Sequence, residues 1–335
     1  MRKFLLSTLG LMVMLSTYGQ QAFFADAGQN VTVTSKGKRE IVPQKFRTST
    51  LDLGALVAFL KTVPFESPAM NRSNAPVVTL PMPDGSFARF HVWESPIMEP
   101  GLQQKFPDIR TYTGQGINDR TATIRFDVNP YTGFHAQILS GEHGRIFIDP
   151  FAKGDLKNYI SYRSADYTRD VQHICNVEEN GEHHQHRTNA PQAVCLGSTL
   201  RTYRLAVSCT GEYAVAVCAP NPPTVAATLA AMVVSMNRVN GVYEKEIAIR
   251  MNLIANNDQL IFLDGATDPF TNNNGSVMLG QNQTTIDNII GNANYDIGHV
   301  FSTGGGGIAS LRSPCQPGQK ALSLIHISEP TRQAE

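Results

Sequence analysis

The chain has 335 residues, of which 41% are hydrophobic and 17% charged, so it has the composition of a folded protein and room for two domains. Its 28 basic and 28 acidic residues cancel at pH 7. No net field attracts nucleic acid, and we expect no nucleic-acid partner. Five cysteines are sparse for a scaffold that depends on disulfides.

The N-terminus has the layout of a secretory signal peptide. Two basic residues precede a largely apolar run from Phe4 to Leu15, and small and polar residues follow it. This run is too short to span a bilayer, and no later segment approaches 18 continuous apolar residues, so we expect no membrane span. We predict a secreted, extracellular protein whose signal peptide occupies residues 1–27, with cleavage after Gly19 or after Ala27.

Residues 28–176 are predicted to form a β-rich domain. Apolar residues recur at helical spacing over 51–62, which indicates one helix. Over 122–128 apolar and polar residues alternate, as expected for a half-buried strand, and turn residues join this strand to a second one at 134–139. A further strand is expected at 145–148. The pattern indicates an antiparallel meander.

A change of composition marks the domain boundary. Over 177–195 the chain is rich in Glu, His, Asn and Gly and has almost nothing to bury. Such a segment is typical of an exposed linker, where proteases cut. We therefore expect 177–195 to be an exposed linker between two domains.

The second domain, predicted over 196–320, has the element order of an α/β domain. A strand at 200–207 is followed by a helix that Thr224 caps, and then by a strand at 247–253. Two strands of one sheet that are joined by one helix must run parallel. The remaining predicted elements are a helix at 285–290 and a strand at 294–302, which runs into four glycines.

Short motifs in both domains carry a family resemblance. In the second domain they are Tyr-Arg-Leu-Ala at 203–206, Thr-Gly-Glu-Tyr at 210–213, the segment 264–270, and the segment 295–309, which is the most specific. In the first domain they are found at 80–85, 99–102 and 112–116. The sequence resembles a reprolysin-type member of the metzincin zinc endopeptidases, in the bacterial secreted branch.

The resemblance implies an α+β prodomain, the antiparallel meander, followed by the α/β upper subdomain of a catalytic domain. In that family the edge strand of the upper sheet lies above the zinc and pairs antiparallel with the substrate polypeptide. The glycines suit close approach of a second backbone. The substrate-binding residues implied are Gly305, Gly306, Gly307, Ile308 and Ala309. The alternative is a flexible glycine loop near the end of a strand.

Cys175 lies at the end of the prodomain and resembles the cysteine-switch segment of the family, although Asn176 stands where that segment usually has Gly. A thiolate is a strong zinc ligand, so the resemblance implies that Cys175 binds the metal in the zymogen and excludes the attacking water. The alternatives are a disulfide to Cys195 or a plain buried thiol. His299 has no histidine four residues on, so we expect a structural histidine and not a metal ligand.

The resemblance implies zinc as the cofactor, held by His-Glu-x-x-His-x-x-Gly-x-x-His. None of the nine histidines is followed by Glu, so this chain contains no predicted catalytic residue. We expect the ligands to lie beyond about residue 320. The tail 321–335 resembles the translation of an adapter used in sequencing libraries, and we predict that it is non-native. The alternative is a genuine divergent tail.

The sequence thus predicts the N-terminal portion of a secreted, zymogenic zinc metalloendopeptidase that acts on polypeptides and is inactive as it stands. The alternative is a secreted β-rich binding or protease-inhibitory module. A serine hydrolase is disfavoured because the chain has no Gly-x-Ser-x-Gly elbow. The sequence makes no prediction of the oligomeric state.

Overall fold

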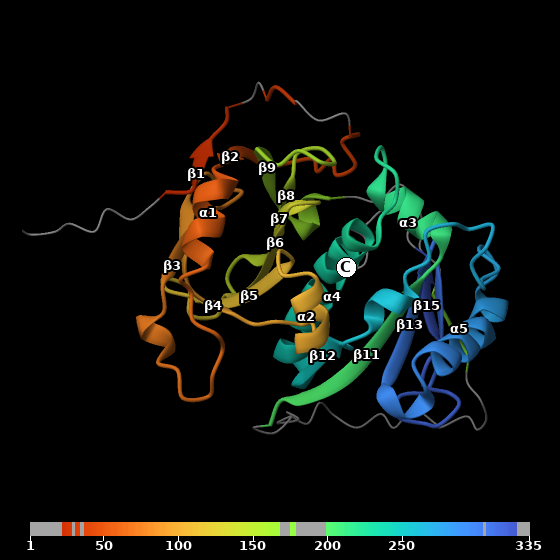
Figure 1. Cartoon of the computed structure of the whole chain (residues 1–335). Helices are drawn as coiled ribbons and strands as arrows, with labels where there is room; N and C mark the ends of the chain where they lie inside the picture. Colours follow the sequence, from red (N-terminus) through yellow and green to blue (C-terminus); the bar gives the residue numbers. More distant parts are fainter. Residues whose placement is uncertain are drawn as a thin grey trace, which may run out of the picture.

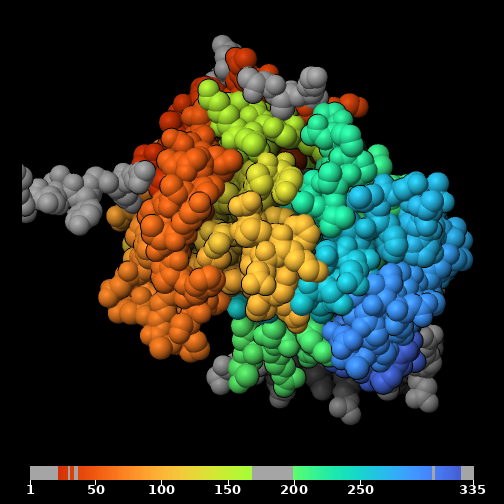
Figure 2. All heavy atoms as spheres, in the orientation of Figure 1, coloured from red at the N-terminus to blue at the C-terminus, as the bar shows by residue number. Residues whose placement is uncertain are grey.

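A computed structural model describes residues 22–28, 31–33, 37–167, 175–178, 199–303 and 306–326. Two β-sheets lie on either side of the long helix α4 (Val225–Ile247), as Figure 1 shows. In the space-filling view the two parts of the chain pack against each other as one body (Figure 2). Most of the predicted signal peptide and most of the predicted linker lie outside the described residues.

The first sheet has nine strands in the order β1-β2-β9-β8-β7-β6-β5-β4-β3, and every pairing is antiparallel. The outer strands β1 and β3 approach each other, so the sheet curves into a nearly closed barrel. This confirms the predicted antiparallel meander. The strands are β1 Phe24–Asp26, β2 Arg47–Leu51, β3 Val77–Pro81, β4 Phe87–Glu94, β5 Arg110–Gly116, β6 Thr123–Asn129, β7 Gly133–Ser140, β8 Gly144–Pro150 and β9 Asn158–Arg163.

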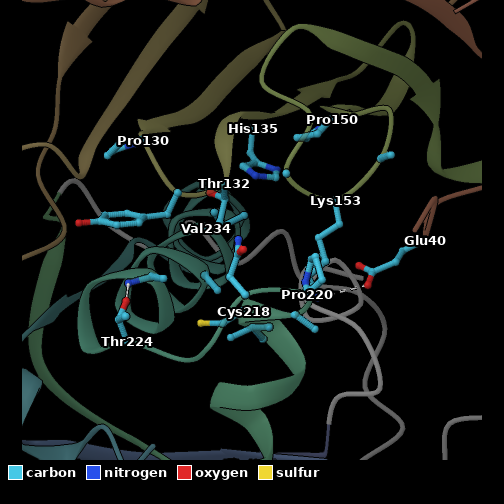
Figure 3. A pocket seen from close by; sticks show the side chains of 18 of the residues that line it. Glu40, Pro130, Thr132, His135, Pro150, Lys153, Cys218, Pro220, Thr224 and Val234 are labelled. Carbon is cyan, nitrogen blue, oxygen red and sulfur yellow. Dashed lines mark hydrogen bonds and ion pairs between the residues drawn. The ribbon is translucent and has the colours of Figure 1, made fainter. Parts of the chain in front are cut away.

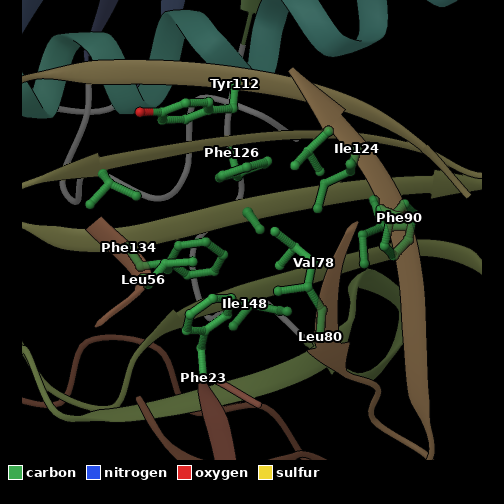
Figure 4. Close-up of a cluster of buried hydrophobic side chains, with 14 of the residues drawn as sticks. Phe23, Leu56, Val78, Leu80, Phe90, Tyr112, Ile124, Phe126, Phe134 and Ile148 are labelled. Carbon is green, nitrogen blue, oxygen red and sulfur yellow. The ribbon is translucent and has the colours of Figure 1, made fainter. Parts of the chain in front are cut away.

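The apolar side chains that alternate along the strands point inward and fill the inside of this barrel (Figure 4). The rings of Tyr112 and Phe126 stack there with their centroids 5.0 Å apart. Helix α1 (Leu53–Leu60) adds Leu56 and Leu60 to the same core. It begins where it does because the carboxylate of Asp52 accepts a hydrogen bond from the backbone N–H of Ala55 at 2.9 Å. The predicted helix at 51–62 is thereby confirmed.

The opposite face of the barrel differs from the sequence prediction. Strand β6 was expected to be half-buried, with its polar side chains in water. Arg125, Asp127 and Asn129 are instead 3%, 1% and 2% exposed. They are buried because α4 packs across β6 and β7 on this side. The alternation of the strand is as predicted, but its polar face is an interface.

The second sheet has the order β10-β14-β15-β13-β11-β12. Strand β11 pairs parallel with both β12 and β13, which confirms the predicted parallel unit around α4. Among the pairings of this sheet that the structure describes, only that of β14 with β15 is antiparallel. The strands are β10 Cys175–Glu178, β11 Arg201–Cys209, β12 Ile249–Leu253, β13 Ile297–Ser302, β14 Gly307–Ser310 and β15 Ser323–His326.

Helix α4 is the longest helix of the described chain. The side chain of Thr224 accepts a hydrogen bond from the Ala227 N–H at 3.2 Å, as predicted for its cap, and the helix ends at Ala248 with φ +54°. Among the described residues it alone has the length and hydropathy to cross a membrane, but 72% of that apolar stretch is buried inside the protein. It is placed as a core helix.

The other helices are short or moderate in length. Helix α5 (Gly275–Ile289) is much longer than the predicted 285–290, because a run of Gly and polar residues at 280–285 interrupts its apolar pattern. Helix α3 (Gly211–Cys218) was not predicted. The remaining helical segments are α2 Pro100–Lys105 and 3₁₀ turns at Arg72–Asn74, Ser164–Asp166, Asn257–Leu260 and Asn292–Asn294.

The two domains share a hydrophobic core. Ile97, Leu102 and Ile109, around α2, belong to the same buried cluster as the apolar residues of β11 and α4. The backbone of this segment also extends the second sheet, since the Leu253 N–H donates to the Ile97 carbonyl at 2.7 Å. The proposed prodomain therefore supplies part of the core of the domain that follows it.

Candidate functional site

Strand β14 carries the predicted substrate-binding residues. Gly305 lies outside the described residues, and Gly306 has φ +97°, a conformation that favours glycine. Gly307, Ile308 and Ala309 form the strand, with Ile308 only 9% exposed. A Cβ on Gly307 would lie 3.2 Å from the carbonyl oxygen of Leu324 on β15, so a neighbouring backbone does approach closely here.

Both sides of β14 are paired. On the inner side it pairs antiparallel with β15, and on the outer side it pairs parallel with β10. The register places Cys175 opposite Gly307 and Glu178 opposite Ser310. The outer side of the predicted substrate strand is therefore covered by the segment that carries the predicted cysteine switch. Cys195, the alternative disulfide partner, lies outside the described residues.

His299 lies on β13, two strands from β14. Its Nδ1 is 2.8 Å from the hydroxyl oxygen of Ser323 on β15, and its ring meets the ring of Phe301 edge-on at 5.2 Å. Burial lowers the pKa of His299 to about 4, so the ring is neutral at pH 7. The side chain links β13 to β15, as a structural histidine would.

The most specific motif, 295–309, is held in place by contacts within the second domain. Asp296 forms a two-oxygen ion pair with the guanidinium of Arg204, with one N–O distance of 2.7 Å. The hydrogen bond from Arg204 lowers the pKa of the Asp296 carboxyl. The hydroxyl of Tyr295 donates to Asp287 on α5 at 2.8 Å. These contacts hold β13 against its neighbours. Part of the motif therefore has a structural role that requires no catalytic function.

Two structural observations bear on the prediction that the tail 321–335 is non-native. Strand β15 lies between β13 and β14, and Ala321 just before it is fully buried. A Cβ on Gly298 would lie only 2.3 Å from the Cβ of Ala321, so β13 and the tail approach at a position where only glycine fits. The non-native origin of 321–335 stays a prediction, which the nucleotide sequence of the gene tests.

Two further motifs, at 210–213 and 264–270, meet at the end of β11. Thr210 caps α3 by accepting a hydrogen bond from the Tyr213 N–H at 3.2 Å. The Gly211 N–H donates to the carboxylate of Asp268 at 2.6 Å. Burial raises the pKa of that carboxyl, although this hydrogen bond opposes the shift. The two segments therefore form one turn-and-cap unit.

Gly211→Ala is expected to destabilise the protein by about 3 kcal/mol. The new Cβ would lie 2.0 Å from the backbone nitrogen of Gly265, and a backbone atom cannot turn aside. Gly280→Ala in α5 is the matched control, because its Cβ meets nothing within 4 Å and alanine favours a helix. Urea unfolding of both variants measures the difference. Equal midpoints would contradict the predicted clash.

A cavity of about 350 Å³ lies where the two domains meet (Figure 3). His135 and Lys153 reach into it from the first domain, whereas Cys218 and Val234 line it from the second. Lys153 pairs with Glu40 at 3.3 Å and also donates to the backbone of the second domain. The cavity is otherwise mostly apolar.

A buried ionic network crosses the interface beside this cavity. Asp149 on β8 accepts from Nδ1 of His135 at 2.7 Å, from the hydroxyl of Tyr162 at 3.0 Å, and from the guanidinium of Arg238 on α4. Burial alone would raise the pKa of Asp149, but Arg238 and His135 outweigh it and hold the pKa at about 2. Asp149 is therefore ionised and holds the two domains together.

No sequence pattern predicted this network. Its only sequence signal is that polar positions of the strands, such as His135 on β7 and Asp149 on β8, are ionisable residues where Thr or Ser would serve a surface strand equally well. This signal does not predict which residue each side chain pairs with, because the partners lie about a hundred residues away on α4.

The described residues do not fit the zinc ion that the resemblance implies. A zinc site needs three or four His, Cys, Asp or Glu ligands around one point. One group of three such residues, Asp119, Glu142 and His143, has its donor atoms within 4.8 Å of one another in the described part of the chain. It lies at a loop end of the first sheet, and Asp119 already accepts a hydrogen bond from Ser140. No zinc chemistry is assigned to the described residues.

Comparison with protein families bears on the second domain. Residues 229–334 match the family described as metallo-peptidase family M12B, reprolysin-like. The match begins in α4 and includes β14, His299 and the tail, and peptidases of this family are in general zinc-dependent. No curated protein matches the chain. Over residues 229–334, this chain is similar to the reprolysin-like metallopeptidases of family M12B.

Proposed function

We propose that this chain is the N-terminal portion of a secreted, zymogenic zinc metalloendopeptidase. The observation that carries the proposal is the M12B family match over 229–334, on the sheet that contains the predicted substrate strand β14. Residues 28–176 act as the prodomain and 196–320 as the first part of the catalytic domain. The substrate is a polypeptide.

Substrate binding is proposed to occur by strand addition to β14. The backbone groups on the outer side of β14 pair with β10 in this structure. Once 175–178 leaves, those N–H and C=O groups are unpaired and can bind an extended peptide with little dependence on its sequence. Strand β10 runs parallel to β14, whereas the family resemblance implies an antiparallel substrate. The prodomain segment therefore occupies the binding edge in the opposite direction.

Latency is proposed to depend on the same segment. Cys175 lies at the start of β10, opposite Gly307, so the pairing places the backbone of the predicted switch residue beside the substrate strand. Cleavage in the part of 177–195 that follows Glu178, the last residue of β10, cuts the chain after this strand and allows it to dissociate. The zinc ligands are proposed to lie in a part of the complete protein that follows the present sequence, and the 335-residue chain is proposed to be inactive.

The N-terminal core favours one of the two predicted signal-cleavage positions. Phe23 and Phe24 are each 3% exposed and belong to the core of the first domain, where Phe24 forms part of β1. Cleavage after Ala27 would remove both rings and that strand. We therefore propose that the secreted form begins after Gly19.

The test is peptide hydrolysis by the product of the complete reading frame. We expect no hydrolysis by the 335-residue chain with added zinc, and chelator-sensitive hydrolysis by the complete protein after cleavage in 177–195. Cys175→Ser is expected to give activity before cleavage, whereas Cys315→Ser, at an exposed free cysteine, is the control and stays latent. A complete gene without a histidine triplet after the matched region would refute the enzyme proposal. Unchanged latency of Cys175→Ser would refute only the switch.

A further inference from the structure

We propose that a second interdomain cavity, distinct from the one beside His135, binds a small divalent oxyanion such as sulfate or phosphate. This cavity of about 240 Å³ lies between α4 and the outer face of β5, β6 and β7. The proposal rests on the charges that line it, on two buried polar side chains without partners, and on its position between the domains.

The lining has an excess of positive charge. Four basic side chains face two carboxylates, which leaves two positive charges without a counter-charge among the lining residues. These six residues are Arg72, Arg125, Lys245, Arg250, Glu66 and Glu244. The excess gives the cavity a positive potential, which attracts an anion.

The two carboxylates are engaged mainly by two of the four cations. Glu244 pairs with both Arg125 and Arg250, and Glu66 lies 2.8 Å from Arg250. Arg72 is farther from Glu66, at 3.8 Å, and its side chain is 60% exposed. Arg72 is therefore the less neutralised arginine, and its guanidinium lies over the Trp93 ring at 5.0 Å, beside the unpaired indole N–H.

Lys245 has no carboxylate partner in the described residues. Its ammonium donates to two backbone carbonyls, those of Thr121 at 3.0 Å and Leu139 at 2.9 Å. These bonds fix the ammonium at the cavity wall without cancelling its charge. Lys245 lies on α4 and Arg72 on the first domain, so the two excess charges belong to opposite sides of the cavity.

Two polar side chains that line the cavity are buried without partners. Gln137 is 1% exposed, and neither its amide nitrogen nor its amide oxygen has a hydrogen bond. The indole N–H of Trp93, which is 3% exposed, is also unpaired. Buried donors of this kind are rare and normally have a partner. An oxyanion offers acceptors to the Gln137 amide and to the Trp93 indole, and its charge matches the excess.

The cavity walls come from both domains, since Gly241 and Arg250 belong to the second and Trp93 and Gln137 to the first. An anion bound here therefore stabilises the domain packing, because it binds the assembled protein and not the separated domains. This inference does not depend on the proposed peptidase function.

The experiment is thermal unfolding of the whole chain in millimolar sulfate or phosphate, compared with chloride at equal ionic strength. We expect a saturable rise in melting temperature of about 2 °C at ten times the dissociation constant, and no rise with chloride. Arg72→Gln and Lys245→Gln are each expected to weaken anion binding about tenfold. Lys61→Gln, at an exposed lysine outside the cavity, is the control and keeps the full shift.

The outcomes separate the possibilities. A shift with both oxyanions that both cavity variants reduce supports the proposal, and the stronger of the two identifies the preferred ion. An equal effect of chloride, a linear rise without saturation, or a full shift in both cavity variants would overturn it, since general salt effects act on the whole surface. If one variant does not fold, the other still decides.

Discussion

Arg238→Met is expected to lower the free energy of unfolding by about 3–5 kcal/mol. Arg238 and Asp149 are 2% and 0% exposed, and the guanidinium also lies over the ring of Phe147 at 5.0 Å. Methionine fills much of the same volume but leaves the Asp149 carboxylate buried without its main counter-charge. Breaking a buried pair in this way costs more than the pair contributes, because an uncompensated charge stays in the interior.

The control for this prediction is an ion pair at the surface. Arg204 and Asp296 keep 44% and 26% of their side chains exposed, so Arg204→Met is expected to cost about 1 kcal/mol or less. Urea unfolding of both variants gives the comparison. If Arg238→Met costs no more than Arg204→Met, the interface does not depend on the Asp149 pair.

The second large effect is a loss of stability as the pH rises from 4 to 7, caused by Asp127. Burial raises the pKa of this carboxyl from its ordinary value of 3.8 to about 7, and its Oδ2 has no hydrogen-bond partner. Between these two pH values the folded protein keeps a proton that the unfolded chain has released. The contribution of protonated Asp127 to the free energy of unfolding is therefore fully present below pH 4. By pH 7 the free energy of unfolding has fallen by about 4 kcal/mol.

The groups around Asp127 come from three elements. His135 lies opposite it on β7, Asp149 is on β8, and Asn237 and Arg238 face it from α4. His135 and Arg238 favour the ionised form and Asp149 opposes it, but burial is the largest cause. Asp149 acts in the opposite direction to Asp127, because its contribution is lost only as the pH falls from about 4 to 2.

The measurement is the free energy of unfolding at several pH values for the wild type and Asp127→Asn. The amide has the same shape and does not titrate, so the variant is expected to be about as stable as the wild type at pH 4 and more stable at pH 8. Asp108→Asn, at an exposed carboxyl, is the control and follows the wild type. A constant difference between wild type and Asp127→Asn across this range would show that Asp127 does not titrate there.

The amino-acid sequence by itself determined the local elements and the family. The alternation in β6 and β7, the Thr224 cap of α4 and the parallel unit built around it are all properties of neighbouring residues, so they can be found without a structure. The same holds for the motif at 295–309, which predicted the reprolysin-like family. Helix α5 was only partly found, because the run of Gly and polar residues at 280–285 separates the apolar residues of its first turn from those at its end.

Only the tertiary structure decided what the polar face of the first sheet does. Arg125 and Asp127 alternate in the sequence as surface residues would, yet α4 covers them, and their partners lie on that helix about a hundred residues later. The pairing of 175–178 with β14 could not be predicted for the same reason, because it joins segments about 130 residues apart. A sequence pattern reports which side of a strand is polar, but whether that side meets water or another element depends on long-range packing, which local periodicity does not encode.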